Sequence, residues 1–363
     1  MGDLAAEIEK LKEQIEEKYD ERRGEGTFGS APSLEKYELN QSRLLKGHFG
    51  KIYAMHWSGK SCTTPLLVSA SQDGKLIVWD GSTSHKKQAV PLRSSWVMTC
   101  AFEGKSNRLL ACGGLDNLCS IYERSTEDGA AASVQRAKIE LSQHDGYLSC
   151  CRFVDEKSIV TSSGDSTCIL WDLETGNVSN TFQDHVGDVM SVSLNPNDPS
   201  VFCSGSCDAT CKLWDTRTKA EVDKNRNPKP SAAMTFFGHE SDINATAYFP
   251  DGKCIGTGSD DSSCFLFDTR SNMWVNKFVH ETILCGITSV DFSSSGRFLL
   301  AGYDDYKCRV WDTLVSEEEG GNGGLKHTLQ GHENRVSCLG VQADGWALCT
   351  GGWDTTLKIY SGK

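Results

Sequence analysis

The sequence predicts an all-β protein, a seven-bladed β-propeller that follows an N-terminal coiled-coil α-helix. The first observation is a repeat. An aspartate followed six residues later by an aromatic residue occurs seven times, at Asp73, Asp116, Asp165, Asp208, Asp261, Asp305 and Asp354. Six of these aspartates have a histidine 21 to 25 residues before them, namely His48, His144, His185, His239, His280 and His332. A period in the forties with Gly-His and Trp-Asp ends is typical of a propeller blade. The second observation is a short heptad pattern within residues 1–23.

Each repeat predicts four short strands. In the first repeat, runs rich in Val, Ile and Leu end at Gly, Asp or Ser within residues 44–80, which is the pattern of half-buried antiparallel strands. One blade cannot bury both of its faces, so the blades are expected to stack around an axis. Residues 43–46 precede the first Gly-His, and the last repeat holds only three strands. We therefore expect the early strand to complete the last blade and close the ring.

The repeated histidines and aspartates are expected to bond to one another. In each of the six repeats that contain both, the aspartate of the turn can accept a hydrogen bond from the Gly-His imidazole, which ties two loops together on one rim. A catalytic role is excluded because the pair recurs without a privileged serine, an oxyanion glycine motif or a phosphate loop. The sequence therefore predicts a protein that is not an enzyme.

The N-terminal segment has a different pattern. Its apolar residues are spaced by four, three and four positions among Glu, Lys and Gln, at Leu4, Ile8, Leu11 and Ile15. This is the seam of a coiled-coil helix, and two heptads are too short to be stable alone. The seam is expected to need a helix from another chain, although docking on its own propeller is the alternative. The predicted organisation is a helix at 1–23, a linker at 24–39 and the propeller at 40–363.

Composition excludes several classes of function. The net charge of −12 opposes nucleic-acid binding, which usually needs a basic stripe. No apolar run of 18 residues predicts a transmembrane helix, and the acidic N-terminus lacks the layout of a signal peptide. The 16 cysteines are scattered through strand-like segments, which favours reduced thiols in the cytosol and predicts no metal site. We expect no cofactor.

One rim of the propeller is expected to bind another protein. Strand alternation places on this rim the neighbours of the first buried residue of each inner strand, together with residues beside each turn aspartate. The predicted rim combines large apolar side chains with acids and a lysine, as protein-binding hot spots do. The alternative is that some of these side chains, most readily Cys207 and Leu115, fold inward and plug the central channel.

Several stretches are more specific than a generic blade requires: KIYAMHW at 51–57, LVSASQDGKLIVWD at 67–80, PLRSSWVMTC at 91–100 and CGGLDNLCSIY at 112–122. Through these and similar words the chain resembles the beta subunit of heterotrimeric G proteins, a WD-repeat family, over nearly all of residues 40–360 and in the helix before them.

The resemblance implies a non-catalytic signal transducer. The helix, through Leu4, Ile8, Leu11 and Ile15, would pair with a small prenylated gamma subunit. The rim would bind the GDP-bound alpha subunit, and effectors once a G protein-coupled receptor has triggered release. By motif match, this role falls on Lys51, Tyr53, Trp96, Met98, Leu115, Asn117, Tyr147, Asp188, Met190, Asp242, Asp260 and Trp353, with a side contact at Ile77 and Lys86. The chain would be cytoplasmic and held at the inner face of the plasma membrane by lipid on its partners.

A second hypothesis is a generic WD-repeat scaffold or adaptor, such as a ribosome-associated adaptor or a ubiquitin-ligase substrate receptor, because propellers host many functions. Such a scaffold does not require a short unpartnered coil, and receptors for phosphorylated segments usually carry an arginine cluster on the rim. The segments 218–234 and 316–324 depart from the family pattern and are expected to be surface loops. Tyr360 replaces the usual Trp, and the tail Ser361-Gly362-Lys363 is extra.

Overall fold

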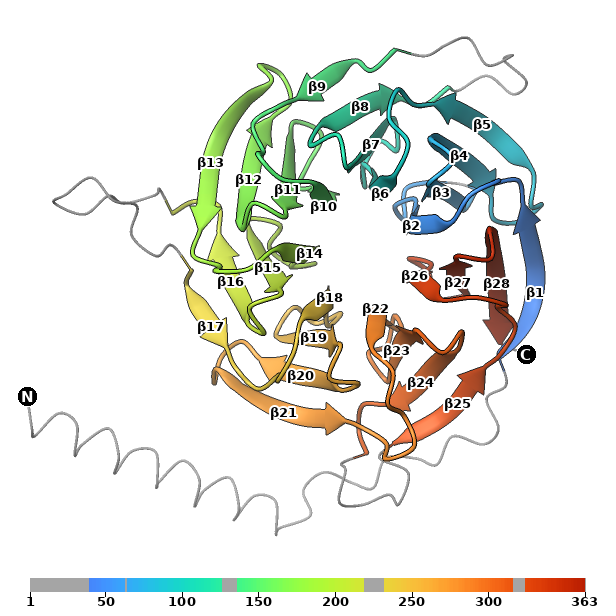
Figure 1. The fold of residues 1–363 in the computed structure, drawn as a ribbon, viewed down its shortest axis with the longest axis vertical. Helices are drawn as coiled ribbons and strands as arrows, with labels where there is room; N and C mark the ends of the chain where they lie inside the picture. The colour runs from blue at the N-terminus through green and yellow to red at the C-terminus, as the bar shows by residue number, and fades with distance from the viewer. Residues whose placement is uncertain (1–38, 63, 126–135, 219–231, 316–323, 363) are drawn as a thin grey trace, which may run out of the picture. The chain divides into compact units, whose positions relative to one another are not determined.

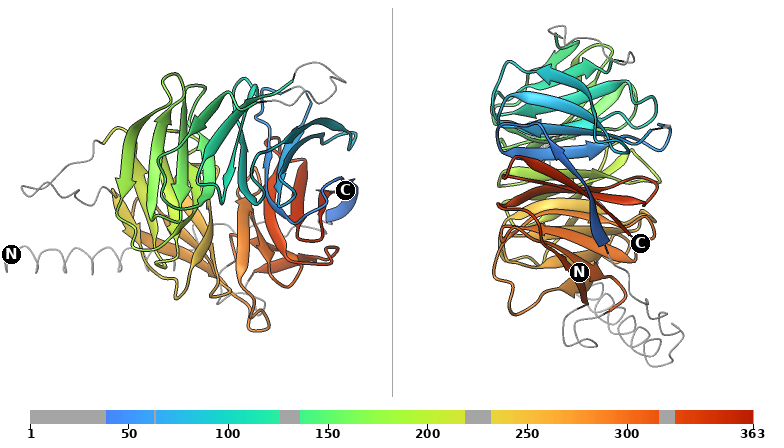
Figure 2. Two further views of the ribbon diagram at one scale, coloured as in Figure 1. Left: turned by 45° about the horizontal axis from the view of Figure 1, so that its top comes forward. Right: turned by 90° about the vertical axis from the view of Figure 1, so that its right-hand side faces the viewer.

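The computed structural model describes residues 39–62, 64–125, 136–218, 232–315 and 324–362. Within these ranges the structure contains 28 strands and no helix. The strands form seven four-stranded antiparallel sheets around a central axis (Figures 1 and 2). The predicted seven-bladed propeller is confirmed. The predicted helix at 1–23, the linker up to residue 38 and most of the segments 218–234 and 316–324 lie outside the described residues. No helix long and apolar enough to cross a membrane occurs in the described part of the chain.

The blades follow one another along the chain, each with its first strand nearest the axis (Figure 1). Blade 1 consists of β2 (Ile52–Trp57), β3 (Leu66–Ser71), β4 (Lys75–Asp80) and β5 (Lys86–Pro91). Blade 2 consists of β6 (Val97–Phe102), β7 (Leu109–Gly114), β8 (Cys119–Glu123) and β9 (Ile139–Leu141). Blade 3 consists of β10 (Leu148–Phe153), β11 (Ser158–Ser163), β12 (Thr167–Asp172) and β13 (Asn177–Gln183). Blade 4 consists of β14 (Val189–Leu194), β15 (Val201–Ser206), β16 (Cys211–Asp215) and β17 (Met234–Phe236).

The last three blades include the point where the ring closes. Blade 5 consists of β18 (Ile243–Tyr248), β19 (Cys254–Ser259), β20 (Cys264–Asp268) and β21 (Met273–Phe278). Blade 6 consists of β22 (Ile287–Phe292), β23 (Phe298–Tyr303), β24 (Cys308–Asp312) and β25 (Leu325–Leu329). Blade 7 consists of β26 (Val336–Val341), β27 (Ala347–Gly352), β28 (Thr356–Gly362) and β1 (Leu39–Lys46). β1 pairs antiparallel with β28, so the early strand completes the last blade as expected.

The core lies between neighbouring blades, because each sheet buries both faces against the next sheet. At the closure point, Leu45 of β1 packs in one cluster with Trp57 of blade 1 and Leu357 of blade 7. The Nε1–H of Trp57 donates to the carbonyl of Gly340 at 2.9 Å, which links blade 1 to blade 7. The second strand of each blade is buried over at least five of its six residues, and every residue of β3 is buried.

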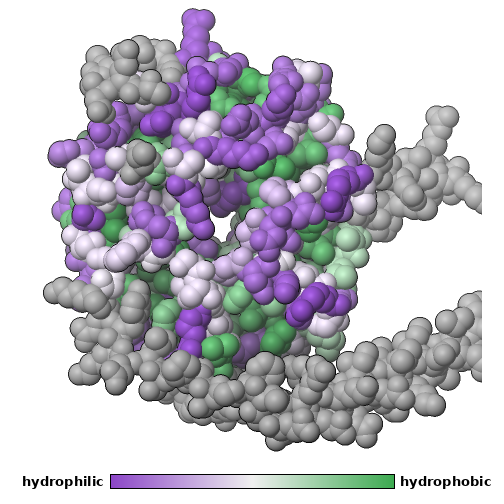
Figure 3. All heavy atoms as spheres, turned by 180° about the vertical axis from the view of Figure 1, so that it is seen from behind, coloured by the Kyte–Doolittle hydropathy of each residue, from purple (hydrophilic) through white to green (hydrophobic). Residues whose placement is uncertain are grey.

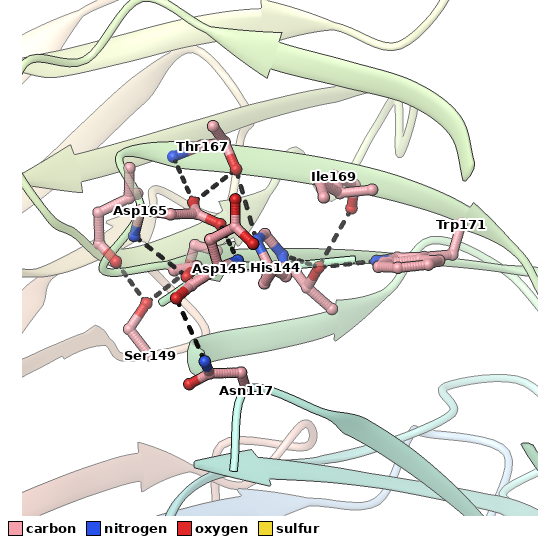
Figure 4. A network of polar contacts seen from close by, with 12 residues as sticks. Asn117, His144, Asp145, Ser149, Asp165, Thr167, Ile169 and Trp171 are labelled. Carbon is pink, nitrogen blue, oxygen red and sulfur yellow. Dashed lines mark hydrogen bonds and ion pairs between the residues drawn. The ribbon is translucent and has the colours of Figure 1, made fainter. Parts of the chain in front are cut away.

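Five of the six expected His–Asp pairs are present, and Figure 4 shows the pair in blade 3. His144 Nδ1 lies 2.8 Å from Asp165 Oδ2, and its Nε2 lies 2.8 Å from the hydroxyl of Thr161. Trp171 Nε1–H donates to the same hydroxyl at 2.8 Å. Burial alone would raise the pKa of Asp165, but the bonds from His144 and Thr167 lower it overall. The equivalent histidines in the other four blades are His48, His185, His239 and His332.

The prediction of a sixth pair, His280 with Asp305, is wrong. His280 lies seven residues before its inner strand, whereas the other five histidines lie four residues before theirs. Its Nδ1 bonds to Thr282 at 2.8 Å, and Asp305 instead accepts two hydrogen bonds from Arg309. Blade 6 also has Ala301 at the position where the five blades with a His–Asp pair provide the Ser or Thr hydroxyl. In blade 6 the hydroxyl of Tyr303 instead accepts the Nε1–H of Trp311 at 3.2 Å.

Candidate protein-binding surface

The predicted rim residues are brought together by a backbone hydrogen bond that recurs in all seven blades. In each blade, the residue before the turn aspartate donates its N–H to the carbonyl of the residue before the inner strand, at 2.9 to 3.3 Å. This bond pairs Leu115 with Trp96, Asp260 with Asp242, and Trp353 with Arg335. Two loops that are far apart in sequence therefore present their side chains side by side.

A β-bulge at the second residue of every inner strand adds a third member to each pair. The strand register shifts around Tyr53, Met98, Ser149, Met190, Asn244, Thr288 and Ser337. A bulge changes the direction of a side chain and ends regular pairing. The three positions, before the strand, in the bulge and beside the turn aspartate, account for all twelve residues that the blade pattern and the family resemblance both predicted for the rim.

An aromatic cluster joins blades 1, 2 and 7 on this rim. The Tyr53 ring lies 6.1 Å from that of Trp96 and 5.9 Å from that of Trp353, measured between centroids. Lys51 Nζ lies 3.9 Å above the Trp353 ring. Trp96 is 41% exposed and has a φ of 64°, a left-handed conformation that bulky residues rarely adopt. Exposed aromatic rings that are already held by their neighbours lose little entropy when a partner covers them.

An acidic segment continues the surface across blades 3 to 5. Tyr147 donates its hydroxyl hydrogen to Asp188 at 3.0 Å and lies 3.3 Å from the sulfur of Met190. Burial, followed by the bond to Asp188, raises the pKa of Tyr147, which therefore stays neutral. In the next blade Asn244 donates to Asp260 at 2.6 Å. The rim thus has an aromatic and cationic side at blades 1, 2 and 7 and an acidic side opposite.

The central channel has an end away from the rim, which is lined by residues outside the predicted set. A cavity of about 400 Å³ at the axis is lined by inner-strand residues of all seven blades, and none of the fourteen predicted alpha- or effector-binding residues lines it. Leu115 is 52% exposed, so it does not fold inward as the alternative supposed. Figure 3 shows the ring from behind, open at its centre and surrounded mostly by hydrophilic residues.

Three ionisable side chains from separate blades line this channel: His56, Arg152 and Asp291. His56 Nδ1 accepts the N–H of Phe102 at 3.1 Å, and burial together with Arg152 lowers the pKa of His56 to about 3. Burial raises the pKa of Asp291 to about 6, although the N–H groups of Val341 and Phe292 bond to it. Within the described residues, no group of His, Cys, Asp and Glu is arranged to hold a metal ion.

The two residues of the predicted side contact are placed differently. Lys86 is exposed at the start of β5, with its Nζ 5.5 Å above the Trp79 ring. Ile77 is only 2% exposed and packs with Leu45 and Trp79 in the cluster between blades 1 and 7. We correct the prediction for Ile77, because a side chain enclosed by this core is not available to a partner.

Two exposed apolar residues on the rim were missed. Phe49 and Val186 directly follow loop histidines and are 84% and 89% exposed. Their N–H groups donate to Asp73 and Asp208, so their backbones are fixed while their side chains face solvent. The sequence could have identified both residues. Blades 3, 5 and 7 have the acids Asp145, Glu240 and Glu333 at the same position, so an apolar residue there stands out.

Comparisons with known proteins agree with the geometry. The family model for the G protein beta WD-40 repeat protein matches residues 1–361. A guanine nucleotide-binding protein G(I)/G(S)/G(T) subunit beta-1 from Homarus americanus is 50% identical over 99% of this chain and 99% of its own length. A guanine nucleotide-binding protein subunit beta from Solanum tuberosum is 42% identical over 94% of this chain and 88% of its own length. The chain belongs to the G protein beta subunit family, whose members transduce signals and are not enzymes.

Proposed function

We propose that the rim binds a GDP-bound alpha subunit and, after the alpha subunit is released, binds effectors. The observation that carries this proposal is the half-buried cluster of Tyr53, Trp96 and Trp353, which lies beside Lys51 and opposite the acidic side of the rim. Protein-binding hot spots combine aromatic anchors with a polar border in this way.

The proposed mechanism is sequestration followed by release. The rim holds the alpha subunit while GDP is bound, and nucleotide exchange rearranges the contacting segment of the alpha subunit so that the contacts are lost. The exposed rim then becomes available to effectors. Residues 1–23 pair with a gamma subunit through Leu4, Ile8, Leu11 and Ile15, and lipid on the partners holds the complex at the inner face of the plasma membrane.

Binding to the two nucleotide states of an alpha subunit tests the proposal. The chain is co-expressed with a gamma subunit, and its affinity for GDP-loaded and GTP-loaded alpha subunit is measured by biolayer interferometry. We expect tight binding only in the GDP state. Truncating a hot-spot aromatic costs at least ~2 kcal/mol, so Trp96→Ala should weaken binding about 30-fold.

Trp346→Ala is the matched control. Trp346 is 78% exposed, but it lies between β26 and β27, at the end of blade 7 opposite to the turn aspartates. This variant should bind as the unchanged chain does. Equal affinity for the two nucleotide states, or an equal loss in both tryptophan variants, contradicts the proposed surface.

A further inference from the structure

Blade 2 lacks the side chain that fills one internal site in its neighbours. In blades 1, 3, 4, 5 and 7, an imidazole lies between the turn aspartate, at 2.8 to 3.1 Å, and a Ser or Thr hydroxyl, at 2.7 to 2.8 Å. In blade 6 the guanidinium of Arg309 bonds to the turn aspartate instead and stacks 4.3 Å from the centre of the Tyr303 ring. Six of the seven turn aspartates therefore bond a nitrogen-rich planar group of the chain itself.

In blade 2, no such group bonds to the turn aspartate within the described residues. Arg93 lies four residues before β6, where the other blades place histidine, and Cys112 replaces the hydroxyl residue. The Arg93 side chain is 79% exposed and turns outward to Glu140, with 3.3 Å between Nη1 and Oε1. Asp116 accepts the N–H of Leu118 at 3.3 Å, its one hydrogen bond within the described ranges.

A cavity of about 50 Å³ lies at this position. It is lined by Asp116, Cys112, Tyr122, Trp96, Arg93 and Glu140, among others. Trp96 and Asp116 are both exposed, so the cavity opens onto the rim. A water molecule needs roughly 10–15 Å³ of such space, so the cavity holds about three to five non-hydrogen atoms. Guanidinium has four.

The walls of the cavity combine carboxylates with aromatic rings, and Arg93, which also lines it, is paired with Glu140. Asp116 provides carboxylate oxygens. Tyr122 and Trp96 provide aromatic walls, against which guanidinium groups stack well. Carboxylates bind guanidinium through two parallel charge-assisted hydrogen bonds, and Arg309 makes this bidentate contact with Asp305 at the corresponding aspartate of blade 6. The blade geometry therefore accommodates a guanidinium at this position.

We propose that the blade 2 cavity receives the guanidinium group of an arginine side chain from a polypeptide docked on the rim. The arginine bonds to Asp116 and lies against Tyr122 beside Trp96. This inference rests on the proposed function for the identity of the docked chain. The preference of the cavity for a guanidinium group is tested without an alpha subunit.

The test measures binding of methylguanidinium to the chain co-expressed with a gamma subunit, using chemical-shift perturbation of labelled tryptophan side chains. Methylurea is the neutral control of the same shape. Methylguanidinium should bind at least about tenfold more tightly and shift the Trp96 signal, because a charge-assisted bond contributes more than a neutral one. Equal binding of the two compounds, or tighter binding of imidazole than of methylguanidinium, overturns the proposal.

Two variants locate the site. Arg93→His combined with Cys112→Thr restores the repeat and should fill the cavity and abolish binding. If this variant does not fold, Asp116→Asn keeps the test, since it removes the charge at an exposed position and should weaken binding at least about tenfold. Glu240→Gln, an exposed carboxylate in a blade that His239 already fills, is the matched control and should bind normally. Unchanged binding in Asp116→Asn overturns the proposal.

The outcomes separate this inference from the proposed function. If the alpha subunit binds both nucleotide states equally while methylguanidinium still binds through Asp116, the proposed function fails and the cavity assignment stands. If the alpha subunit binds only with GDP while methylguanidinium does not bind, the cavity assignment fails alone.

Discussion

Removing one turn aspartate should destabilise the propeller only where a histidine or an arginine of the chain bonds to it. Asp165 accepts four hydrogen bonds, from His144 Nδ1 at 2.8 Å, the Thr167 hydroxyl at 2.6 Å, the Thr167 N–H at 2.9 Å and the Asp145 N–H at 3.1 Å. Bonds to a charged group contribute about 1.5–3 kcal/mol each but share one acceptor, so Asp165→Ala should cost about 3–5 kcal/mol. Asp116→Ala removes the equivalent residue of blade 2, where one bond at 3.3 Å is lost, and should cost about 0.5 kcal/mol or less.

Urea unfolding of the two variants decides this prediction. Both variants are co-expressed with a gamma subunit at one fixed concentration, because binding of a partner adds to apparent stability. Tryptophan fluorescence reports unfolding, and Trp171 lies within the affected network. Equal losses in Asp165→Ala and Asp116→Ala would refute the reasoning, because the cost would then come from the turn itself and not from the bonded imidazole.

Three further predictions concern the blades. Leu45→Ala in the closing strand should cost about 2–4 kcal/mol because the side chain is 1% exposed, whereas Leu44→Ala, at 39% exposed, should cost little; thermal unfolding compares them, and similar values would contradict closure by β1. Ala209 has a φ of 61° at the position that Gly74 occupies in blade 1, so Ala209→Gly should raise the free energy of unfolding by about 0.5–1 kcal/mol in urea unfolding; a loss would count against left-handed strain. Burial raises the pKa of Asp291 to about 6 in the folded protein. The stability that the protonated carboxyl contributes is therefore fully present below about pH 4, the pKa in the unfolded chain, and is lost as pH rises to about 6. Asp291→Asn should therefore gain about 2–3 kcal/mol relative to the unchanged chain between pH 4 and pH 7, measured by urea unfolding at each pH, and a constant difference would contradict the shift.

The ring, its closing strand and five of the His–Asp pairs could be predicted because each depends on residues repeated at a nearly constant spacing. The failure at His280 has a physical cause. Its distance of 25 residues from Asp305 equals that of His48 from Asp73, so spacing to the aspartate alone does not separate a bonded pair from an unbonded one. The spacing between the histidine and the inner strand separates the two cases, but the start of that strand was not known from the sequence.

The residues of the rim could be predicted from the sequence, but the bulges and the cavity around them could not. Alternation along a strand identified Tyr53 and Met98, although a bulge places both residues and breaks that alternation. The resemblance to a family placed Ile77 at a surface, whereas its own strand places it against Leu45. The blade 2 cavity was not predicted, because it depends on the outward turn of Arg93, which no sequence pattern encodes. Pairing of residues 1–23 with a gamma subunit stays a prediction.

The clasp between β1 and β28 has a consequence for biosynthesis. Ser42 donates its hydroxyl hydrogen to the carbonyl of Ile359 at 3.0 Å, across a sequence separation of 317 residues. At roughly 5–20 residues per second, a ribosome needs about 15–60 s to make the second of these residues after the first. Throughout that interval the nascent chain has an unpaired strand edge at each end and exposed apolar sheet faces. The incomplete propeller is therefore prone to aggregate until its last strand has been synthesised.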